Sequence, residues 1–147
     1  MHISEVMTHG VVTAETGESL RRVGELMRDR NVGSVVICDE GRPHALITDR
    51  DVALAVADAV DRGDAAEGRV TRPLVTGEAD MGVEEAAALM VQHGIRRLPV
   101  LDGADLAGIV TLDDLAVRTG DLKMAQQMTA DVARAALPEF YFHQRGE

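Results

Sequence analysis

The sequence predicts an α/β (α+β) fold made of two copies of one β-α-β-β-α unit, followed by a C-terminal helix. Three observations lead to this prediction. The chain of 147 residues matches itself without a gap when it is shifted from Thr8 to Thr71, an offset of 63. Each copy places a helical hydrophobic pattern between short apolar runs of strand length. Hydrophobic residues make up 46% of the chain, which suffices for a core without disulfide or metal support.

The self-match extends from about Glu5–Leu54 onto Gly68–Val117, and apolar character persists where identity fails. Single identities are weak evidence, but a shared offset without a gap indicates an internal duplication. The repeat predicts a first domain at 1–62 and a second domain at 68–119. Residues 63–67 are polar and contain glycine, which favours an exposed linker. Residues 120–147 then form a helix and a tail.

Each copy begins with a short extended stretch and continues with an amphipathic helix. Two apolar runs around a polar turn follow and predict a hairpin. A second helix starts where the last run ends, at Asp49 or Leu112, and the C-terminal helix covers Asp121–Leu137, where Pro138 ends it. The other predicted elements, first copy and then second copy, are Gly10–Thr13, Glu18–Arg30, Ser34–Cys38 and Ala45–Thr48; and Pro73–Thr76, Val83–His93, Leu98–Leu101 and Leu106–Thr111.

Composition excludes several classes of protein. The net charge of −10 argues against nucleic-acid binding, which needs a basic face to displace counterions. No apolar run approaches the roughly 20 residues of a membrane span, so we expect no membrane partner. The first residues do not resemble a signal peptide. Cys38 has no second cysteine with which to pair. A reducing, cytoplasmic location is therefore expected.

Catalysis is not expected either. The five histidines lack the spacing of a metal site, so no metal-binding residues are predicted. No nucleophile motif of the Gly-x-Ser-x-Gly type and no glycine-rich phosphate loop with lysine occurs. Cys38 ends an apolar run and is interpreted as a buried, inert thiol. The sequence thus predicts a protein that is not an enzyme and has no catalytic residues.

One polar motif occurs in both copies where the last strand becomes the second helix. It reads Thr-x-x-Asp, as Thr48 to Asp51 and as Thr111 to Asp114. The structural interpretation is a capping box, in which the two side chains satisfy amides of the helix start. The functional interpretation is a nucleotide site, because free amides and the positive helix end attract phosphate. The carboxylate then accepts from the two hydroxyls of a ribose. The sequence leaves both interpretations open.

The doubled motif, with Leu-Ile-Thr-Asp-Arg-Asp in one copy and Gly-Ile-Val-Thr-Leu-Asp-Asp in the other, resembles the CBS domain. The resemblance covers about Met1 to Arg118. A pair of such domains (a Bateman module) with no attached enzyme or channel is similar to the small stand-alone bacterial CBS proteins associated with stress. The resemblance implies two repeats related by a pseudo-two-fold axis, with two clefts between them. It also implies an adenosine ligand such as AMP, ADP or ATP, with S-adenosylmethionine or NAD less favoured, and no covalent cofactor.

The resemblance also implies roles for particular residues. Thr48 and Asp51 would serve one cleft, and Thr111 and Asp114 the other. Main-chain groups at Thr13 and Thr76 would meet the adenine edge, and Val36 and Pro99 would line the base. Arginines could offset or pair with phosphate charge. The nucleotide-binding residues expected are Thr13, Val36, Thr48, Arg50, Asp51, Thr76, Arg97, Pro99, Thr111 and Asp114.

The copies are not identical at this site. The second has Gly108 and Pro99, as the family pattern expects, where the first has Ala45 and Val36. The sequence does not tell which cleft is occupied. CBS pairs commonly associate, so a homodimer is expected, whether parallel or antiparallel. The alternative function is a ligand-free scaffold or stress-response interaction protein that acts through its dimer surfaces.

Overall fold

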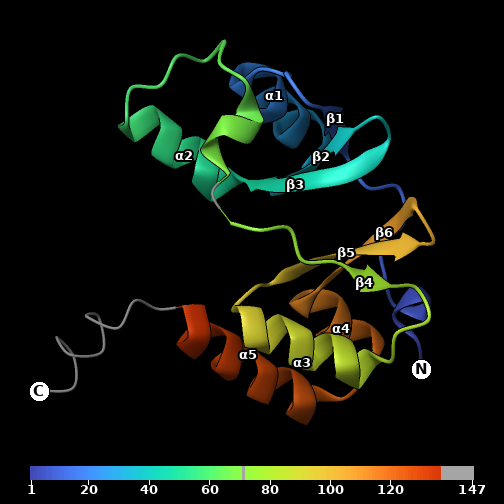
Figure 1. The fold of residues 1–147 in the computed structure, drawn as a ribbon. Helices are drawn as coiled ribbons and strands as arrows, with labels where there is room; N and C mark the ends of the chain where they lie inside the picture. Colours follow the sequence, from blue (N-terminus) through green and yellow to red (C-terminus); the bar gives the residue numbers. More distant parts are fainter. Residues whose placement is uncertain (71, 137–147) are drawn as a thin grey trace, which may run out of the picture. The chain divides into compact units, whose positions relative to one another are not determined.

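The computed structural model describes residues 1–70 and 72–136, and Pro138 lies outside them. It confirms a mixed α/β fold with two three-stranded sheets (Figure 1). The chain divides into two compact units, each described here by itself. The first-repeat unit comprises Gly10–Leu74 with Ala104–Leu106. The second-repeat unit comprises Met1–His9, Val75–Gly103 and the described residues from Ala107 on.

In the first-repeat unit, the sheet has the order β1-β2-β3 and helices α1 and α2 cover one of its faces. Strands β1 and β2 are parallel, and β2 and β3 form an antiparallel hairpin. The hairpin turn consists of Glu40 and Gly41, both with positive φ, as the tight turns that suit twisted strands require. The elements are β1 (Thr13–Glu15), α1 (Leu20–Arg30), β2 (Ser34–Asp39), β3 (Arg42–Thr48), α2 (Asp49–Ala57) and the 3-10 helix η2 (Ala66–Arg69).

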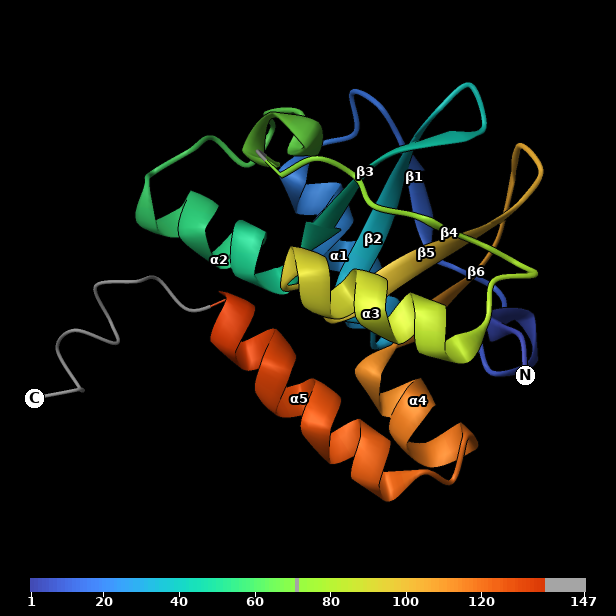
Figure 2. The same ribbon diagram turned by 60° about the horizontal axis from the view of Figure 1, so that its bottom comes forward.

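The second-repeat unit has the same plan, with sheet order β4-β5-β6. Its core joins α3 and α4 to the sheet, and an additional helix, α5, lies beside α3 and α4 (Figure 2). Met128 and Val132 of α5 belong to this core, so the helix packs on the repeat that precedes it. The elements are the 3-10 helix η1 (Ile3–Glu5), β4 (Gly77–Glu78), α3 (Val83–His93), β5 (Arg97–Asp102), β6 (Asp105–Thr111), α4 (Leu112–Arg118) and α5 (Leu122–Ala136).

The segment before each repeat packs on the other repeat. Ile3 lies in the core of the second-repeat unit and its amide donates to the Met81 carbonyl at 2.9 Å. At the equivalent place, Ala66 is fully buried in the core of the first-repeat unit and its amide donates to the Glu18 carbonyl at 2.8 Å. The expectation of an exposed linker at 63–67 is therefore wrong at Ala66. The compact units also differ from the sequence-based domains at 1–62 and 68–119.

The predicted helices and hairpin strands agree with the structure to within a few residues, and both second helices begin at Asp49 and Leu112 as expected. The first strand of each copy lies later than expected, at β1 and β4. The parallel pairing with the middle strand begins only at Thr13, which lies opposite Val36, and at Gly77, which lies opposite Val100. Val12 and Val75, which lie before these strands, pack against the two cores, and the Val12 carbonyl also accepts from the Val36 amide at 3.0 Å.

Candidate functional site: two strand-to-helix corners

The candidate site residues cluster at two corners, where β3 leads into α2 and where β6 leads into α4. Thr48 and Thr111 are the N-caps of these helices and have extended backbone, so each chain turns sharply into its helix. The first helical amide is bound in each case by the loop before the middle strand. Asp49 N donates to the Gly33 carbonyl at 3.0 Å, and Leu112 N donates to the Arg96 carbonyl at 3.1 Å.

At the first corner, Asp51 folds back onto the start of its own helix. Its Oδ2 accepts from the Thr48 amide at 2.8 Å and from the Thr48 hydroxyl at 3.0 Å. The same oxygen is 2.7 Å from a guanidinium nitrogen of Arg72. Among the residues that the structure describes, none donates a hydrogen bond to the other oxygen, Oδ1. The side chain of Asp51 is 12% exposed, so its charge is mostly shielded from water.

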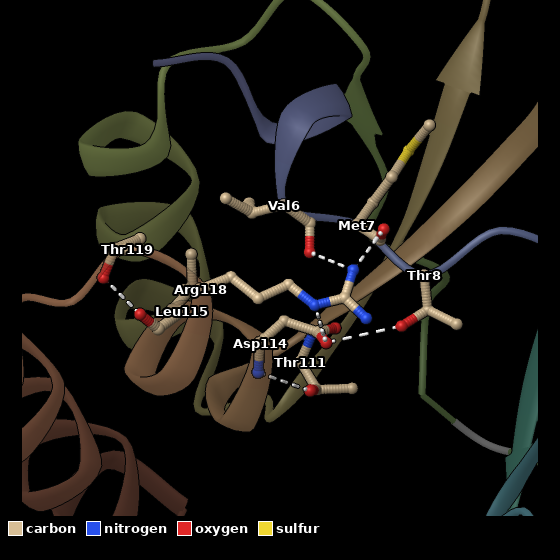
Figure 3. Close-up of polar contacts among 8 residues, drawn as sticks. All are labelled: Val6, Met7, Thr8, Thr111, Asp114, Leu115, Arg118 and Thr119. Atoms are coloured by element: carbon tan, nitrogen blue, oxygen red, sulfur yellow. Dashed lines mark hydrogen bonds and ion pairs between the residues drawn. The ribbon is translucent and has the colours of Figure 1, made fainter.

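At the second corner, both carboxylate oxygens of Asp114 are engaged (Figure 3). Oδ2 accepts from the Thr111 amide at 2.9 Å. Oδ1 accepts from the Thr8 hydroxyl at 3.3 Å and lies 3.6 Å from Nε of Arg118. Arg118 also donates to the carbonyls of Val6 and Met7, so one guanidinium holds the N-terminal segment and the carboxylate together (Figure 3).

The capping-box interpretation of the Thr-x-x-Asp motif is confirmed at both corners. The threonine hydroxyls do not turn outward, because each accepts from the amide of its own aspartate, at 3.4 Å for Asp51 and 3.1 Å for Asp114. The expectation of free helix-start amides is wrong at α2. Asp49 N and Asp51 N have the partners given above, and Arg50 N donates to the carboxylate of Asp49 at 2.9 Å.

The remaining candidate residues lie on the sheets and beside the corners. Thr13 is exposed on β1 opposite Val36 of β2, whose side chain is fully buried. Thr76 is half-buried just before β4, and Pro99 is buried on β5. Arg50 is exposed and Arg97 is half-buried. Within 1–70 and 72–136, no carboxylate forms an ion pair with either arginine.

The sequence did not predict three residues that contact the corner aspartates: Thr8, Arg72 and Arg118. Arg118 could have been found, since it follows Asp114 by four residues on one helix and such pairs of opposite charge face each other. Thr8 matches Thr71 in the repeat, but identity alone does not reveal its contact with Asp114. Arg72 lies 21 residues from Asp51 and carries no local signal of that contact.

In the part of the chain that the structure describes, no cluster of three or more histidine, cysteine or carboxylate side chains could hold a metal ion. Nor does that part contain a helix with the length and apolar character needed to cross a membrane.

Comparison with known proteins identifies the repeat. The model of the CBS domain matches residues 3–58 and again residues 66–118. The CBS domain-containing protein YhcV of Bacillus subtilis is 35% identical over 136 residues, which cover 92% of this chain and 91% of the relative.

Two solved structures add detail. The CBS domain protein PAE2072 from Pyrobaculum aerophilum, complexed with AMP, has a TM-score of 0.77 and 26% identity, covering 86% of this chain and 99% of that one. Hypoxic Response Protein I with two coordinated zinc ions has a TM-score of 0.72 and 28% identity, covering 80% of this chain and 98% of that one. The doubled match, the shared fold and the two capped corners agree, and the chain belongs to the CBS domain family.

Proposed function

We propose that this protein is a regulatory CBS pair that binds an adenosine nucleotide such as AMP, ADP or ATP and catalyses no reaction. The observation that carries the proposal is the similarity to a CBS protein complexed with AMP, which extends over 86% of this chain. Both repeats keep the Thr-x-x-Asp corner, at Thr48–Asp51 and at Thr111–Asp114.

The ribose is the part of the ligand that suits the corner aspartate. An ionised carboxylate is a pure acceptor, and the two hydroxyls of a ribose are donors. Capping uses chiefly Oδ2 of Asp51, so a hydroxyl that donates to Oδ1 does not have to disrupt the helix start. A hydrogen bond to a charged group contributes about 1.5–3 kcal/mol, which makes this contact a substantial part of the affinity.

Phosphate needs positive charge close to each corner, and the two repeats supply it differently. Arg50 is the second residue of α2, whereas α4 has Asp113 at that place. The second corner has Arg96 and Arg97 instead, and the Arg96 carbonyl accepts from the first amide of α4. Arginine binds phosphate through planar, charge-assisted hydrogen bonds. We expect Arg50 or Arg97 to contact phosphate, and we expect Thr13, Thr76, Val36 and Pro99 to contact the base.

A thermal-shift screen tests this proposal most simply. A ligand that binds only the folded state at 100 times its dissociation constant stabilises that state by about 2.7 kcal/mol, which raises Tm by several degrees. We expect such a rise with AMP, ADP or ATP, and a smaller one with S-adenosylmethionine. No rise with any adenosine compound would contradict the proposal. A rise with zinc chloride alone would point to a metal-binding protein instead.

A second candidate function is a scaffold whose corners hold no ligand. One observation favours it: the threonine and aspartate of both motifs already satisfy each other and the helix start. If the protein is such a scaffold, we expect that adenosine compounds leave Tm unchanged. We also expect a homodimer whose dissociation constant is the same with and without nucleotide. Sedimentation with and without AMP separates the two functions and also tests the expected homodimer. The cytoplasmic location stays a prediction.

A further inference from the structure

Each repeat holds a short segment that precedes the other repeat in the chain. The N-terminal segment (Met1–His9) belongs to the second-repeat unit, and the linker segment (residues 64–70) belongs to the first-repeat unit. We infer that each repeat is a docking site for one of these segments, and that a size-matched pair of residues decides which segment fits. The pairs are Ile3 with Gly77, and Ala66 with Ala14.

The two segments dock through the same backbone contacts. The Ile3 amide donates to the Met81 carbonyl at 2.9 Å, as the Ala66 amide donates to the Glu18 carbonyl at 2.8 Å. The start of the following helix binds back to each segment, from Val83 N to the Met1 carbonyl at 3.1 Å and from Leu20 N to the Asp64 carbonyl at 2.9 Å. Backbone groups are the same in nearly every residue, so these bonds place the segments but do not select them. Selection has to come from side chains.

The second-repeat site leaves room for a large side chain at Gly77 of β4. A Cβ on Gly77 would lie 3.0 Å from Cδ1 of Ile3 and 3.0 Å from Cδ2 of Leu98. Both of these side chains are fully buried, so neither can move aside into solvent. The backbone at Gly77 does not have positive φ, so glycine is required here for space and not for conformation.

The first-repeat site has the opposite sizes. The offset of the duplication places Ala14 of β1 at the position of Gly77, and Ala66 at the position of Ile3. Both strand residues pair in parallel with the middle strand of their sheet, at the same register. Ala14 and Ala66 are buried in one core. The methyl group that the strand gains is therefore matched by a smaller residue on the segment.

The two pairs disfavour the wrong docking. A side chain as large as that of Ile3 would overpack the first-repeat site, because Ala14 carries a Cβ there. A residue as small as Ala66 would leave a cavity beside Gly77 in the second-repeat site. Because the duplication makes the backbone of the two sites alike, this difference in size specifies a single arrangement of the chain.

A double-mutant cycle in the intact protein tests the pair of Ile3 and Gly77. The Thr8 amide donates to the Ile109 carbonyl at 2.8 Å, so its exchange with solvent reports undocking of the N-terminal segment. We expect Ile3→Ala and Gly77→Ala each to speed this exchange about tenfold, because the undocked state gains population. The double variant should exchange at least about fivefold more slowly than the product of the two effects, since the added methyl fills part of the vacated space.

The reciprocal experiment uses the first repeat. We expect Ala66→Ile to lower the urea midpoint, because the larger side chain meets the Cβ of Ala14. Ala14→Gly should lower the midpoint of the parent, since glycine weakens a strand, but should raise the midpoint of the Ala66→Ile variant. Ala53→Ile is the matched control: Ala53 is exposed on α2, and Ala14→Gly should lower the midpoint in that background as it does in the parent.

Independent effects would overturn the inference. Exchange rates that simply multiply in the Ile3→Ala, Gly77→Ala variant would show that the two residues are not matched in size, and so would unchanged exchange in Gly77→Ala alone. A lower midpoint on adding Ala14→Gly to Ala66→Ile would contradict the second pair. If Ala66→Ile does not fold, recovery of folding on adding Ala14→Gly supports the pair, and continued failure to fold contradicts it.

Discussion

Gly108 is a position where the two repeats differ by one side-chain atom, the Cβ. A Cβ at this position would lie 2.6 Å from Sδ of Met7 and 2.8 Å from the Thr8 carbonyl oxygen. Real Cβ atoms do not approach other atoms so closely. Only glycine at this position therefore allows the N-terminal residues Met7 and Thr8 to lie so close to β6. The equivalent residue of the first repeat is Ala45, which is buried at 7% exposure.

We therefore predict that Gly108→Ala destabilises the protein by about 1–3 kcal/mol, as overpacking does. Gly24→Ala is the control: Gly24 lies within α1, a Cβ there meets nothing within 4 Å, and alanine favours helix by about 0.5–1 kcal/mol. Urea unfolding of both variants measures the two changes. A Gly108→Ala variant as stable as its parent would contradict the close approach of the segment.

Cys38 yields a prediction about pH. Burial raises the pKa of its thiol, and the nearby negative charge of Glu15 adds to the effect. The folded state therefore keeps the thiol proton at a pH where the unfolded chain has lost it. The thiol's contribution to stability is complete below the unfolded pKa and is lost as pH rises through the folded pKa.

We expect the free energy of unfolding to fall between neutral pH and pH values above the usual thiol range. The fall should be smaller in Cys38→Ala, which removes the titrating group. The thiol should also react far more slowly with a disulfide reagent in the folded protein than in urea, because thiolate is the nucleophile. Equal reaction rates in the two conditions would mean that Cys38 is not buried.

At the scale of elements, α5 is the part of the second-repeat unit that the CBS domain matches do not include, since they end at residue 118. Val132 on this helix is fully buried and Met128 is 5% exposed, both within the core. The helix therefore contributes to the stability of the unit. The predicted end of this helix at Leu137 and Pro138, and the aromatic run Phe140–Phe142, lie outside the described residues.

We predict that Val132→Ala lowers the free energy of unfolding by about 1–3 kcal/mol, through lost burial and a small cavity. Val117→Ala makes the same chemical change on α4 at a side chain that is 79% exposed, so it should stay within about 0.5 kcal/mol of the parent. Chemical denaturation at constant m value measures both. Equal effects of the two substitutions would contradict the packing of α5.

The sequence predicted most of the elements because their signals are local. The helical spacing of apolar residues, the caps Thr48 and Thr111, and the hairpin turns all lie within a few residues of the structure they specify. The packing of residues 1–9 on the second repeat and of Ala66 on the first could not be predicted this way. Both depend on long-range contacts, and a polar, glycine-containing segment such as 63–67 looks like a linker when burial is unknown.

The candidate site was predictable in type but not in detail. The spacing of the motif located both corners, and it allowed capping as well as ligand binding. It could not show that Thr8 and Arg118 engage the second aspartate or that Arg72 engages the first, because those contacts join distant residues. The same Thr-x-x-Asp motif therefore has different neighbouring residues in the two repeats.

At the scale of the whole molecule, the duplication supplies two structurally equivalent corners in a chain of net charge −10. This charge repels polyanions such as nucleic acids in general, yet a nucleotide is small enough to respond to one local arginine. The CBS protein from Pyrobaculum aerophilum, to which this chain is similar, is complexed with a ligand of that size, AMP. The expectation of no nucleic-acid partner stays a prediction.

Calorimetric titration of AMP into the parent protein and into the Asp51→Asn, Asp114→Asn double variant tests the central claim most directly. The account predicts saturable binding to the parent and an affinity at least about tenfold weaker in a folded double variant, because the ribose loses its charged acceptor. Binding of equal strength to both proteins would contradict the role given to the corner carboxylates, and absence of heat with the parent would contradict nucleotide binding itself.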